Sequence, residues 1–257
     1  MELGLAAGVS TKHVSFIETG RASPSPEMVL HLADHLDVPM RERNALLLSA
    51  GYAPRFTESP FDAEAMASVR HVLQMSLDHH EPFPAVVVDR RWDVIGANRA
   101  ASVLTAGVEP EMLTPPVNIF RISLHPAGLS TRVVNFDEYA AHLVGRLRRQ
   151  VAQSGDHGLE LLLEEVLTYP GVTTSLAASQ EPGVVLPLVI DVGGARMSLF
   201  STIATFGTPL DVTTAELAIE AFFPADEATE HLLRRSSATA RVASKPVTSD
   251  EEERCAG

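Results

Sequence analysis

The stretch "STKHVSFIETGR", residues 10–21, opens with a serine suited to cap a helix and carries Gly20, which is suited to end one. On a helix over 11–19, Val14 and Ile17 lie three positions apart and share one face. Both are apolar, so this face belongs to a core. The stretch therefore predicts a short helix with one buried face and one free face.

Four side chains occupy the free face in the i, i+1, i+4, i+5 pattern that a recognition helix presents to a DNA major groove: Thr11, Lys12, Ser15 and Phe16. Lysine reaches guanine edges or phosphate, hydroxyls bond to several bases, and a phenylalanine contacts thymine methyls. Two further candidate DNA contacts are Ser10 at the helix start and Arg21 just past its end. An arginine at that place contacts phosphate and fixes the register of the helix on the DNA. An ordinary surface helix fits the same spacing, so the pattern leaves both interpretations open.

The composition is that of a globular chain of 257 residues, 45% hydrophobic and 21% charged, with a formal net charge of −13. No apolar run reaches the ~18 residues that span a bilayer, and no signal peptide is evident, so we expect a cytoplasmic protein without membrane contact. The single cysteine, Cys255, excludes an internal disulfide. A chain this acidic does not coat nucleic acid, so any DNA contact must come from a local face.

The order of helix and strand signals predicts an α+β protein with two modules. Residues 1–56 read as an all-helical module, 57–62 as a linker, 63–235 as a second module and 236–257 as a disordered tail. In the second module strand signals come early and late, with helical segments between them. This order favours an antiparallel sheet with helices on one side.

Turn signals support that sheet. "PAVVVDRRWDVIGAN", residues 84–98, predicts a hairpin, and Gly193-Gly194 predicts another between two late strands. Pro187 cannot donate to a strand ladder, which indicates an edge or a bulge.

Long segments of the chain resemble one family. "AGVS", "HVSFIETGR", "PSPEMVLHLADHLDVP" and "RERNALLLSAGYAP" resemble the helix-turn-helix domain of Xre-type bacterial regulators. "PFPAVVVDRRWDVIGANRAA", "NIFRISLHPAGL", "VVNFDEYAAHLVGRLRR" and "GTPLDVTTAELAIEAFFPADEATEHLL" are similar to the effector domain of the MmyB-like subgroup. The resemblance covers about residues 2–235.

The resemblance implies a five-helix DNA-binding domain followed by a PAS-like fold with an apolar cavity. It further implies a transcription regulator that binds double-stranded operator DNA and an apolar, fatty-acid-like small molecule with one polar end. Such regulators usually bind paired half-sites, so we expect a homodimer.

The chain departs from the family at its start. Family members carry a basic first helix, and "SQ" opens the second; here Met1 falls inside the second helix, so that the glutamine and the cover over Leu3 are missing. Residues 1–56 hold five Lys/Arg against six Asp/Glu, a local charge of −1. We expect weak DNA binding, with either an upstream gene start or a true truncation.

The proposed cavity has candidate linings in the apolar residues of the second module. The strongest are Phe83, Val87, Ile95, Phe120, Phe136 and Phe206. Each of them singly is more often plain core, so the cavity itself rests on the resemblance.

Polar residues within apolar stretches are the second set of candidates, because a buried polar group needs a partner in the fold or in a ligand. Asn118, Arg121 and His125 are candidate ligand contacts. Arg121 either holds a carboxylate or pairs with an acidic neighbour, and His125 either meets the ligand or shapes a turn. For Asn98 we favour a helix cap.

Sequence motifs for other functions are missing. No G-x-S-x-G, Walker A or G-x-G-x-x-G occurs, and no nucleophile or acid–base pair stands out, so we expect neither an enzyme nor a cofactor. His31 and His35 have a zinc-compatible spacing without a third ligand, which favours surface histidines and no metal site. A ligand-binding or protein-interaction module without DNA binding remains the alternative.

Overall fold

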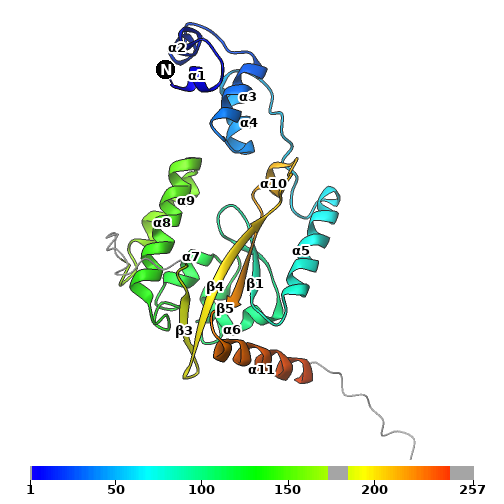
Figure 1. Cartoon of the computed structure of the whole chain (residues 1–257), viewed down its shortest axis with the longest axis vertical. Helices are drawn as coiled ribbons and strands as arrows, with labels where there is room; N and C mark the ends of the chain where they lie inside the picture. The colour runs from blue at the N-terminus through cyan, green and yellow to red at the C-terminus, as the bar shows by residue number, and fades with distance from the viewer. Residues whose placement is uncertain (1, 173–184, 244–257) are drawn as a thin grey trace, which may run out of the picture.

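The computed structural model describes residues 2–172 and 185–243, which form a small helical lobe and a larger lobe built on a sheet (Figure 1). The small lobe contains α1 (Glu2–Ala6), α2 (Thr11–Glu18), α3 (Pro26–His35) and α4 (Met40–Ser49). The predicted helical N-terminal module is confirmed.

Close packing at the start of the small lobe depends on Gly4. A Cβ at this position would lie 2.9 Å from the Val9 carbonyl oxygen and 3.1 Å from the Thr11 Cα. Any larger residue would therefore push α1 away from α2. At the next helix, the Ser25 side chain accepts a hydrogen bond from the Met28 N–H, which fixes the start of α3.

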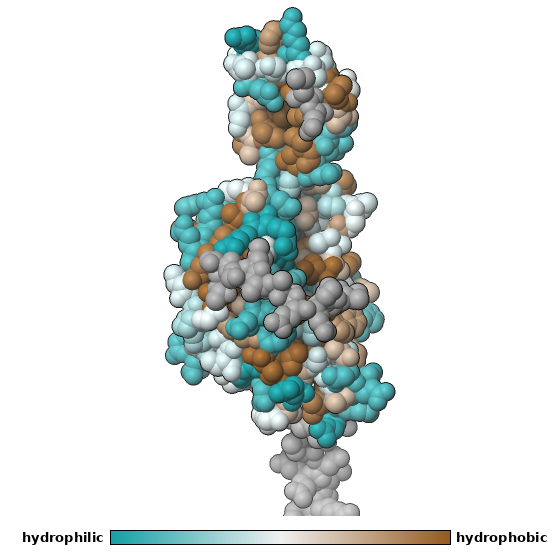
Figure 2. All heavy atoms as spheres, turned by 60° about the vertical axis from the view of Figure 1, so that its left-hand side comes forward, coloured by the Kyte–Doolittle hydropathy of each residue, from teal (hydrophilic) through white to brown (hydrophobic). Residues whose placement is uncertain are grey.

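The small lobe has a modest core. Its buried apolar residues are Ala7, Val14, Val29, Ala33 and Leu47. Leu5, Leu36 and Leu48 are instead more than half exposed, at 78%, 56% and 58%. Figure 2 shows apolar surface gathered on this lobe, above the narrower region that joins it to the large lobe.

The large lobe is built on a five-stranded antiparallel sheet in the order β2-β1-β5-β4-β3. The strands are β1 (Ala85–Val88), β2 (Val94–Ala97), β3 (Leu188–Val192), β4 (Ala195–Thr205) and β5 (Ala218–Pro224). Both predicted hairpins are confirmed. Gly193 and Gly194 adopt positive φ between β3 and β4, and Pro187 directly precedes β3, which is an edge strand.

Helices lie on both faces of the sheet (Figure 1). On one face pack η1 (Glu64–Met66) and α5 (Ala67–His80). The other core contains η2 (Arg99–Ala101), α6 (Ser102–Thr105), η3 (Pro110–Leu113), α7 (Ile119–Leu124), α8 (Phe136–Ser154) and α9 (His157–Val166). The expectation of helices on only one side of the sheet is therefore wrong, because α5 covers the other face of β1 and β5.

The C-terminal part of the described chain contains two further helices. α10 (Val212–Ala215) precedes β5, and α11 (Glu227–Ala243) follows it. The predicted disordered tail from residue 236 is wrong for 236–243, which continue α11; the alanine-rich sequence favours a helix, and the Ser236 hydroxyl donates to the Leu232 carbonyl. Residues 244–257 lie outside the described residues.

The predicted linker is tied to the large lobe. The Ser59 N–H donates to Asp211 Oδ2 (3.0 Å), and the Thr213 hydroxyl donates to the Ser59 carbonyl (2.7 Å). Within residues 2–172 and 185–243, none of the helices combines the length and apolar character needed to span a bilayer.

Candidate DNA-reading helix and ligand cavity

The predicted DNA-contacting side chains of α2 differ in their exposure. Val14 is buried and Ile17 half-buried, whereas Lys12 and Ser15 are exposed. Thr11 and Phe16 are half-buried, and Lys12 Nζ lies 5.6 Å from the centre of the Phe16 ring. Six side chains thus lie on or beside one short helix: Ser10, Thr11, Lys12, Ser15, Phe16 and Arg21.

Past this helix the chain turns back sharply. The Arg21 N–H donates to the Phe16 carbonyl (2.7 Å), and Gly20 supplies the positive φ of 68° that the turn requires. Arg21 is exposed at this turn, three residues beyond the last residue of α2.

The large lobe contains a cavity of about 360 Å³ between the sheet and the helices α6–α8. Most of its lining is apolar, including Val86, Leu104, Ile122, Leu188 and Phe222. The polar lining residues are Asn98, Arg99, Ser102, Thr105, Ser123 and Tyr139. A mainly apolar cavity with a few polar groups is the usual form of a small-molecule site.

The predicted apolar contacts lie elsewhere. Of the described residues that line the cavity, none is among the six apolar candidates. Val87 faces α5 and is buried near Leu77, because strand alternation turns it away from the face of Val86. Phe206 packs against the same α5 cluster. Ile95 is 37% exposed.

The other three aromatic candidates belong to the core. Phe120 is fully buried, edge-on to Trp92 with ring centres 5.5 Å apart. Phe83 and Phe136 pack, partly buried, against the core between the sheet and the helices.

The predicted polar contacts are used by the fold. Asn118 caps α7, accepting from the Phe120 and Arg121 N–H groups and donating to the Arg91 carbonyl and Asp93. His125 Nδ1 accepts from the Ala127 N–H, which holds a turn. The observed contacts of Asn118 and His125 are therefore those of a helix cap and of a turn.

Asn98 has the expected role as a cap. It caps η2 by accepting from the Ala101 N–H. Its amide donates to the Leu77 and Phe83 carbonyls. This one side chain thereby joins α5, β1 and η2 beside the cavity.

Arg121 pairs with an acidic neighbour. Its Nε and Nη2 donate to Glu165 of α9 at 2.9 and 2.7 Å, and the Tyr169 hydroxyl also donates to Glu165. The hydrogen bond from Arg121 is the main cause that lowers the pKa of Glu165. Arg121 thus joins α7 to α9 and does not line the cavity.

Replacing Arg121 with glutamine is expected to destabilise the protein at neutral pH and to cost little in acid. Because the folded pKa of Glu165 lies below its unfolded value of about 4.3, the pair stabilises the fold above that pH. The stabilisation is lost as the pH falls through the folded pKa. Urea unfolding of both proteins at neutral pH and at about pH 3 measures this; an equal cost at both pH values would contradict it.

A buried ion pair lies next to the cavity on the same face of the sheet. Arg146 Nη1 of α8 lies 3.5 Å from Glu220 Oε1 of β5, and the two side chains are 16% and 4% exposed. The guanidinium also stacks over Trp92, 3.7 Å from the ring centre. Arg146 Nη2 and Glu220 Oε2 are buried without a hydrogen-bond partner.

Sequence reasoning missed this pair, although a signal was present. Glu220 is the one charged residue in the apolar run "AIEAFFP" of β5. Arg146 lies seven residues after Tyr139 on the inward stripe of α8, two helical turns along. A lone charge in a buried strand indicates a partner or a ligand.

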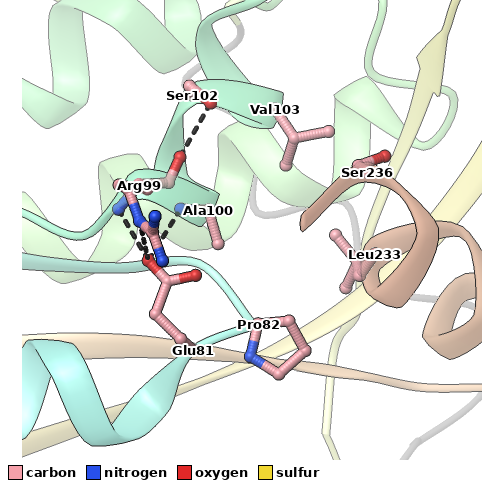
Figure 3. Close-up of a pocket in the computed structure, with 8 residues that line it drawn as sticks. All are labelled: Glu81, Pro82, Arg99, Ala100, Ser102, Val103, Leu233 and Ser236. Carbon is pink, nitrogen blue, oxygen red and sulfur yellow. Dashed lines mark hydrogen bonds and ion pairs between the residues drawn. The ribbon is translucent and has the colours of Figure 1, made fainter. Parts of the chain in front are cut away.

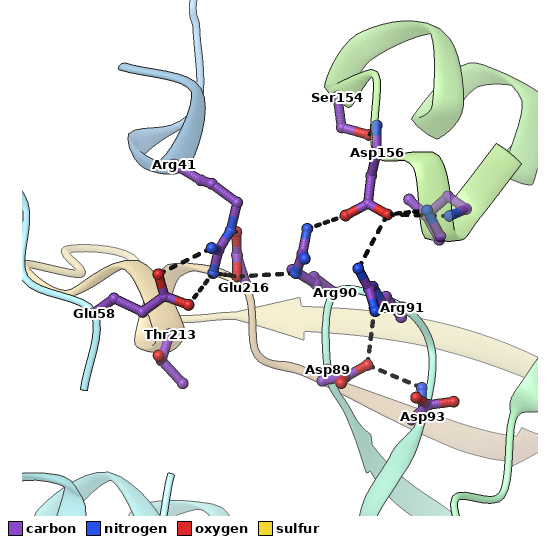
Figure 4. A network of polar contacts seen from close by, with 12 residues as sticks. Arg41, Glu58, Asp89, Arg90, Arg91, Asp93, Ser154, Asp156, Thr213 and Glu216 are labelled. Atoms are coloured by element: carbon purple, nitrogen blue, oxygen red, sulfur yellow. Dashed lines mark hydrogen bonds and ion pairs between the residues drawn. The ribbon is translucent and has the colours of Figure 1, made fainter. Parts of the chain in front are cut away.

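A second polar network joins the two lobes (Figure 4). Arg41 of α4 donates from Nε to Glu216 (2.7 Å) and from Nη2 to Glu58 (2.6 Å). Arg90, in the β1–β2 turn, lies 3.9 Å from Glu216 and pairs with Asp156, which caps α9. The network therefore runs from the helical lobe to the helices around the large-lobe core.

Histidine and acidic residues do not gather into a metal site within the part of the chain that the structure describes. The His31 and His35 rings lie 4.5 Å apart, edge to face. His31 Nε2 bonds to the Ala7 carbonyl (2.7 Å), so this histidine ties α3 to the end of α1.

These features define a class of protein: a helix-turn-helix lobe joined to an α+β lobe that contains a mainly apolar cavity. Residues 69–235 match the model of the MmyB-like transcription regulator ligand binding domain, and residues 2–43 match a helix-turn-helix family. The chain belongs to the MmyB-like transcription regulators. It is a DNA-binding transcription regulator that responds to a ligand, and neither matched family is enzymatic.

Solved structures similar to this chain include a PAS domain and a Light-Oxygen-Voltage receptor. The PAS domain from Bordetella pertussis BvgS is 17% identical with a TM-score of 0.26, covering 68% of this chain and 99% of that one. An RNA-binding Light-Oxygen-Voltage receptor is 13% identical with a TM-score of 0.29, covering 95% of this chain and 56% of that one. No curated protein matches the chain.

Proposed function

We propose that this regulator reads operator DNA through α2 and senses an apolar small molecule in the cavity of its large lobe. The observation that carries the proposal is the cavity itself. Its volume of about 360 Å³ lies within the usual range for small-molecule sites, and its lining is mainly apolar. A fatty-acid-like amphiphile is the ligand class that the family resemblance suggests.

The proposed DNA contacts are the side chains presented by α2 and the turn after it: Ser10, Thr11, Lys12, Ser15, Phe16 and Arg21. Lys12 and Ser15 are exposed, as base-reading side chains must be. The helical module, residues 1–56, carries five basic and six acidic residues, so counterion release adds little to the affinity. We therefore expect weak binding that relies on few contacts.

In this proposal residues 1–56 bind DNA and residues 63–235 bind the ligand, and residues 57–62 connect the two parts. A homodimer gives such a short reading helix enough base pairs for specificity. Arg41 and its partners Glu58 and Glu216 are the contacts through which ligand binding would change the placement of the reading helices.

Replacing Lys12 with alanine is expected to weaken operator binding by about tenfold or more, the usual cost of a lost base contact. Fluorescence anisotropy on the intergenic DNA upstream of the chain's own coding sequence measures it, at several salt concentrations. Arg149→Ala removes the same charge from an exposed position on α8 and serves as the control. Equal losses in both variants would contradict a specific role for α2.

The alternative function is a ligand-binding module that does not bind DNA. The observation that favours it is the local charge of −1 in residues 1–56. The same anisotropy experiment decides between them, since this alternative requires wild-type protein to bind the intergenic DNA no better than random DNA. A catalytic role has little support, because the described lining includes no carboxylate, thiol or imidazole.

A further inference from the structure

We propose that the cavity selects an uncharged lipophile, bound through a hydroxyl or carbonyl oxygen by Tyr139 and Ser123, and discriminates against the carboxylate of a fatty acid. This inference rests on the proposed function, because it names the ligand class of the same cavity. It is carried by how the structure uses each polar group of the lining.

Three polar lining residues already use their hydrogen-bonding groups within the protein. Asn98 makes four hydrogen bonds to backbone groups, which use its carbonyl oxygen twice and both amide hydrogens. The Ser102 hydroxyl donates to the Arg99 carbonyl (2.7 Å), and the Thr105 hydroxyl donates to the Ser102 carbonyl (3.1 Å). These side chains have no hydrogen left to give a ligand.

Tyr139 and Ser123 are the polar groups that remain on the inner wall. Ser123 of α7 is buried, and Tyr139 of α8 lines the cavity beside it. Burial and then the charge of Glu220 raise the pKa of Tyr139, while the charge of Arg146 and then a hydrogen bond with Ser123 oppose the shift. The phenol therefore stays protonated and can donate to a ligand oxygen.

The buried Glu220–Arg146 ion pair lies behind this hydroxyl pair. Glu220 pairs in register with Val86 and lies two residues before Phe222, so its side chain shares the sheet face of these two lining residues. Its Oε2 atom has no hydrogen-bond partner. A ligand carboxylate placed at Tyr139 would be desolvated, and the Arg146–Glu220 pair, whose opposite charges offset each other, would give it no net attraction.

The nearby arginines do not compensate such a carboxylate. Arg146 is paired with Glu220 and stacked on Trp92. Arg132 does not line the cavity, and its guanidinium donates to the carbonyls of Leu104 and Ala106.

Arg99 is the arginine in the lining, and it lies at an outer edge. Its side chain is 59% exposed and lies 3.8 Å from Glu81, which also accepts from the Arg99 and Ala100 N–H groups. Figure 3 shows Arg99 and Glu81 facing each other in a small depression next to Leu233 of α11. This cation is both solvated and paired.

The test compares lauryl alcohol, methyl laurate and laurate, which share one alkyl chain and differ in the head group. Binding to the full chain is measured by calorimetry and by the emission of Trp92, the single tryptophan, at neutral pH and below micelle formation. We expect the alcohol and the ester to bind at least about tenfold more tightly than laurate.

Variants separate the head-group contact from general effects on the fold. Tyr139→Phe is expected to weaken lauryl alcohol binding about tenfold, the usual effect of one lost hydrogen bond. Tyr52→Phe makes the same change in the small lobe, where the hydroxyl donates to the Pro24 carbonyl away from the cavity, and should leave the affinity unchanged. Circular dichroism checks that both variants are folded.

The outcomes distinguish the two proposals. Tighter binding of laurate than of the alcohol overturns the head-group inference alone, and its loss in Arg99→Gln would place the carboxylate at the rim. An unchanged affinity in folded Tyr139→Phe also overturns it. Binding of none of the three probes overturns the proposed cavity function and this inference with it.

Discussion

Replacing Arg146 with methionine while Glu220 is kept is expected to lower the free energy of unfolding by about 3–5 kcal/mol, the usual cost of breaking a buried ion pair from one side. The glutamate, 4% exposed, would keep its desolvation penalty and lose its only ion-pair partner among the described residues. Urea unfolding followed by circular dichroism measures the change.

The double variant Arg146→Met with Glu220→Leu is the matched control. Replacing both partners by apolar groups removes the uncompensated charge, so the double variant should recover most of the lost stability. A double variant as unstable as the single one would contradict the account, because the loss would then come from packing against Trp92. A neutral single variant would also contradict it.

Replacing Val117 with tryptophan is expected to abolish binding of the lauryl probes, with an affinity loss of about a hundredfold or more. Val117 is half-buried in the segment before α7 and lines the cavity, so a bulkier side chain has space to turn inward and fill it. Calorimetry with lauryl alcohol measures the loss.

Val72→Trp is the control for that experiment. It adds the same bulk to α5 at a position that is 46% exposed and lies on a helix that contributes nothing to the described lining. Its affinity should equal that of the wild type. If folded Val117→Trp also binds normally, the ligand lies elsewhere and the cavity is not the site.

Most of the fold was predictable because its signals are local. Gly8 and Gly20 end the helices before and within residues 10–21, and Gly193-Gly194 turns β3 into β4. The strand order could not be predicted from such signals. β5 lies between β1 and β4, and the strands β1 and β5 that pair are more than a hundred residues apart in the sequence. The extension of α11 through residue 243 was missed because a polar, small-residue sequence was interpreted as disorder.

The cavity lining was harder to predict than the elements around it. In the run Val86-Val87-Val88 strand alternation allows two assignments of faces, and only the position of α5 decides that Val86 faces the cavity. An irregularity in the β1–β2 register between Val87 and Val88 further hides the alternation.

The roles of the polar candidates could not be predicted for a different reason. Asn118, Arg121 and His125 stand out in apolar sequence, yet each is bonded to backbone or to an acidic residue. Sequence marks a buried polar group but cannot tell whether the partner is the fold or a ligand. Glu220 was the more informative signal, because a single carboxylate within a strand needs a distant partner.

Native mass spectrometry of the full chain, purified and then incubated with lauryl alcohol, tests most directly that the large lobe holds a small molecule in this cavity. The account predicts a one-to-one adduct, or a co-purifying lipophile in its place, in the wild type and in Val72→Trp. It predicts the bare chain mass in folded Val117→Trp. The same adduct in Val117→Trp as in the wild type, or a bare wild-type chain under these conditions, would contradict it.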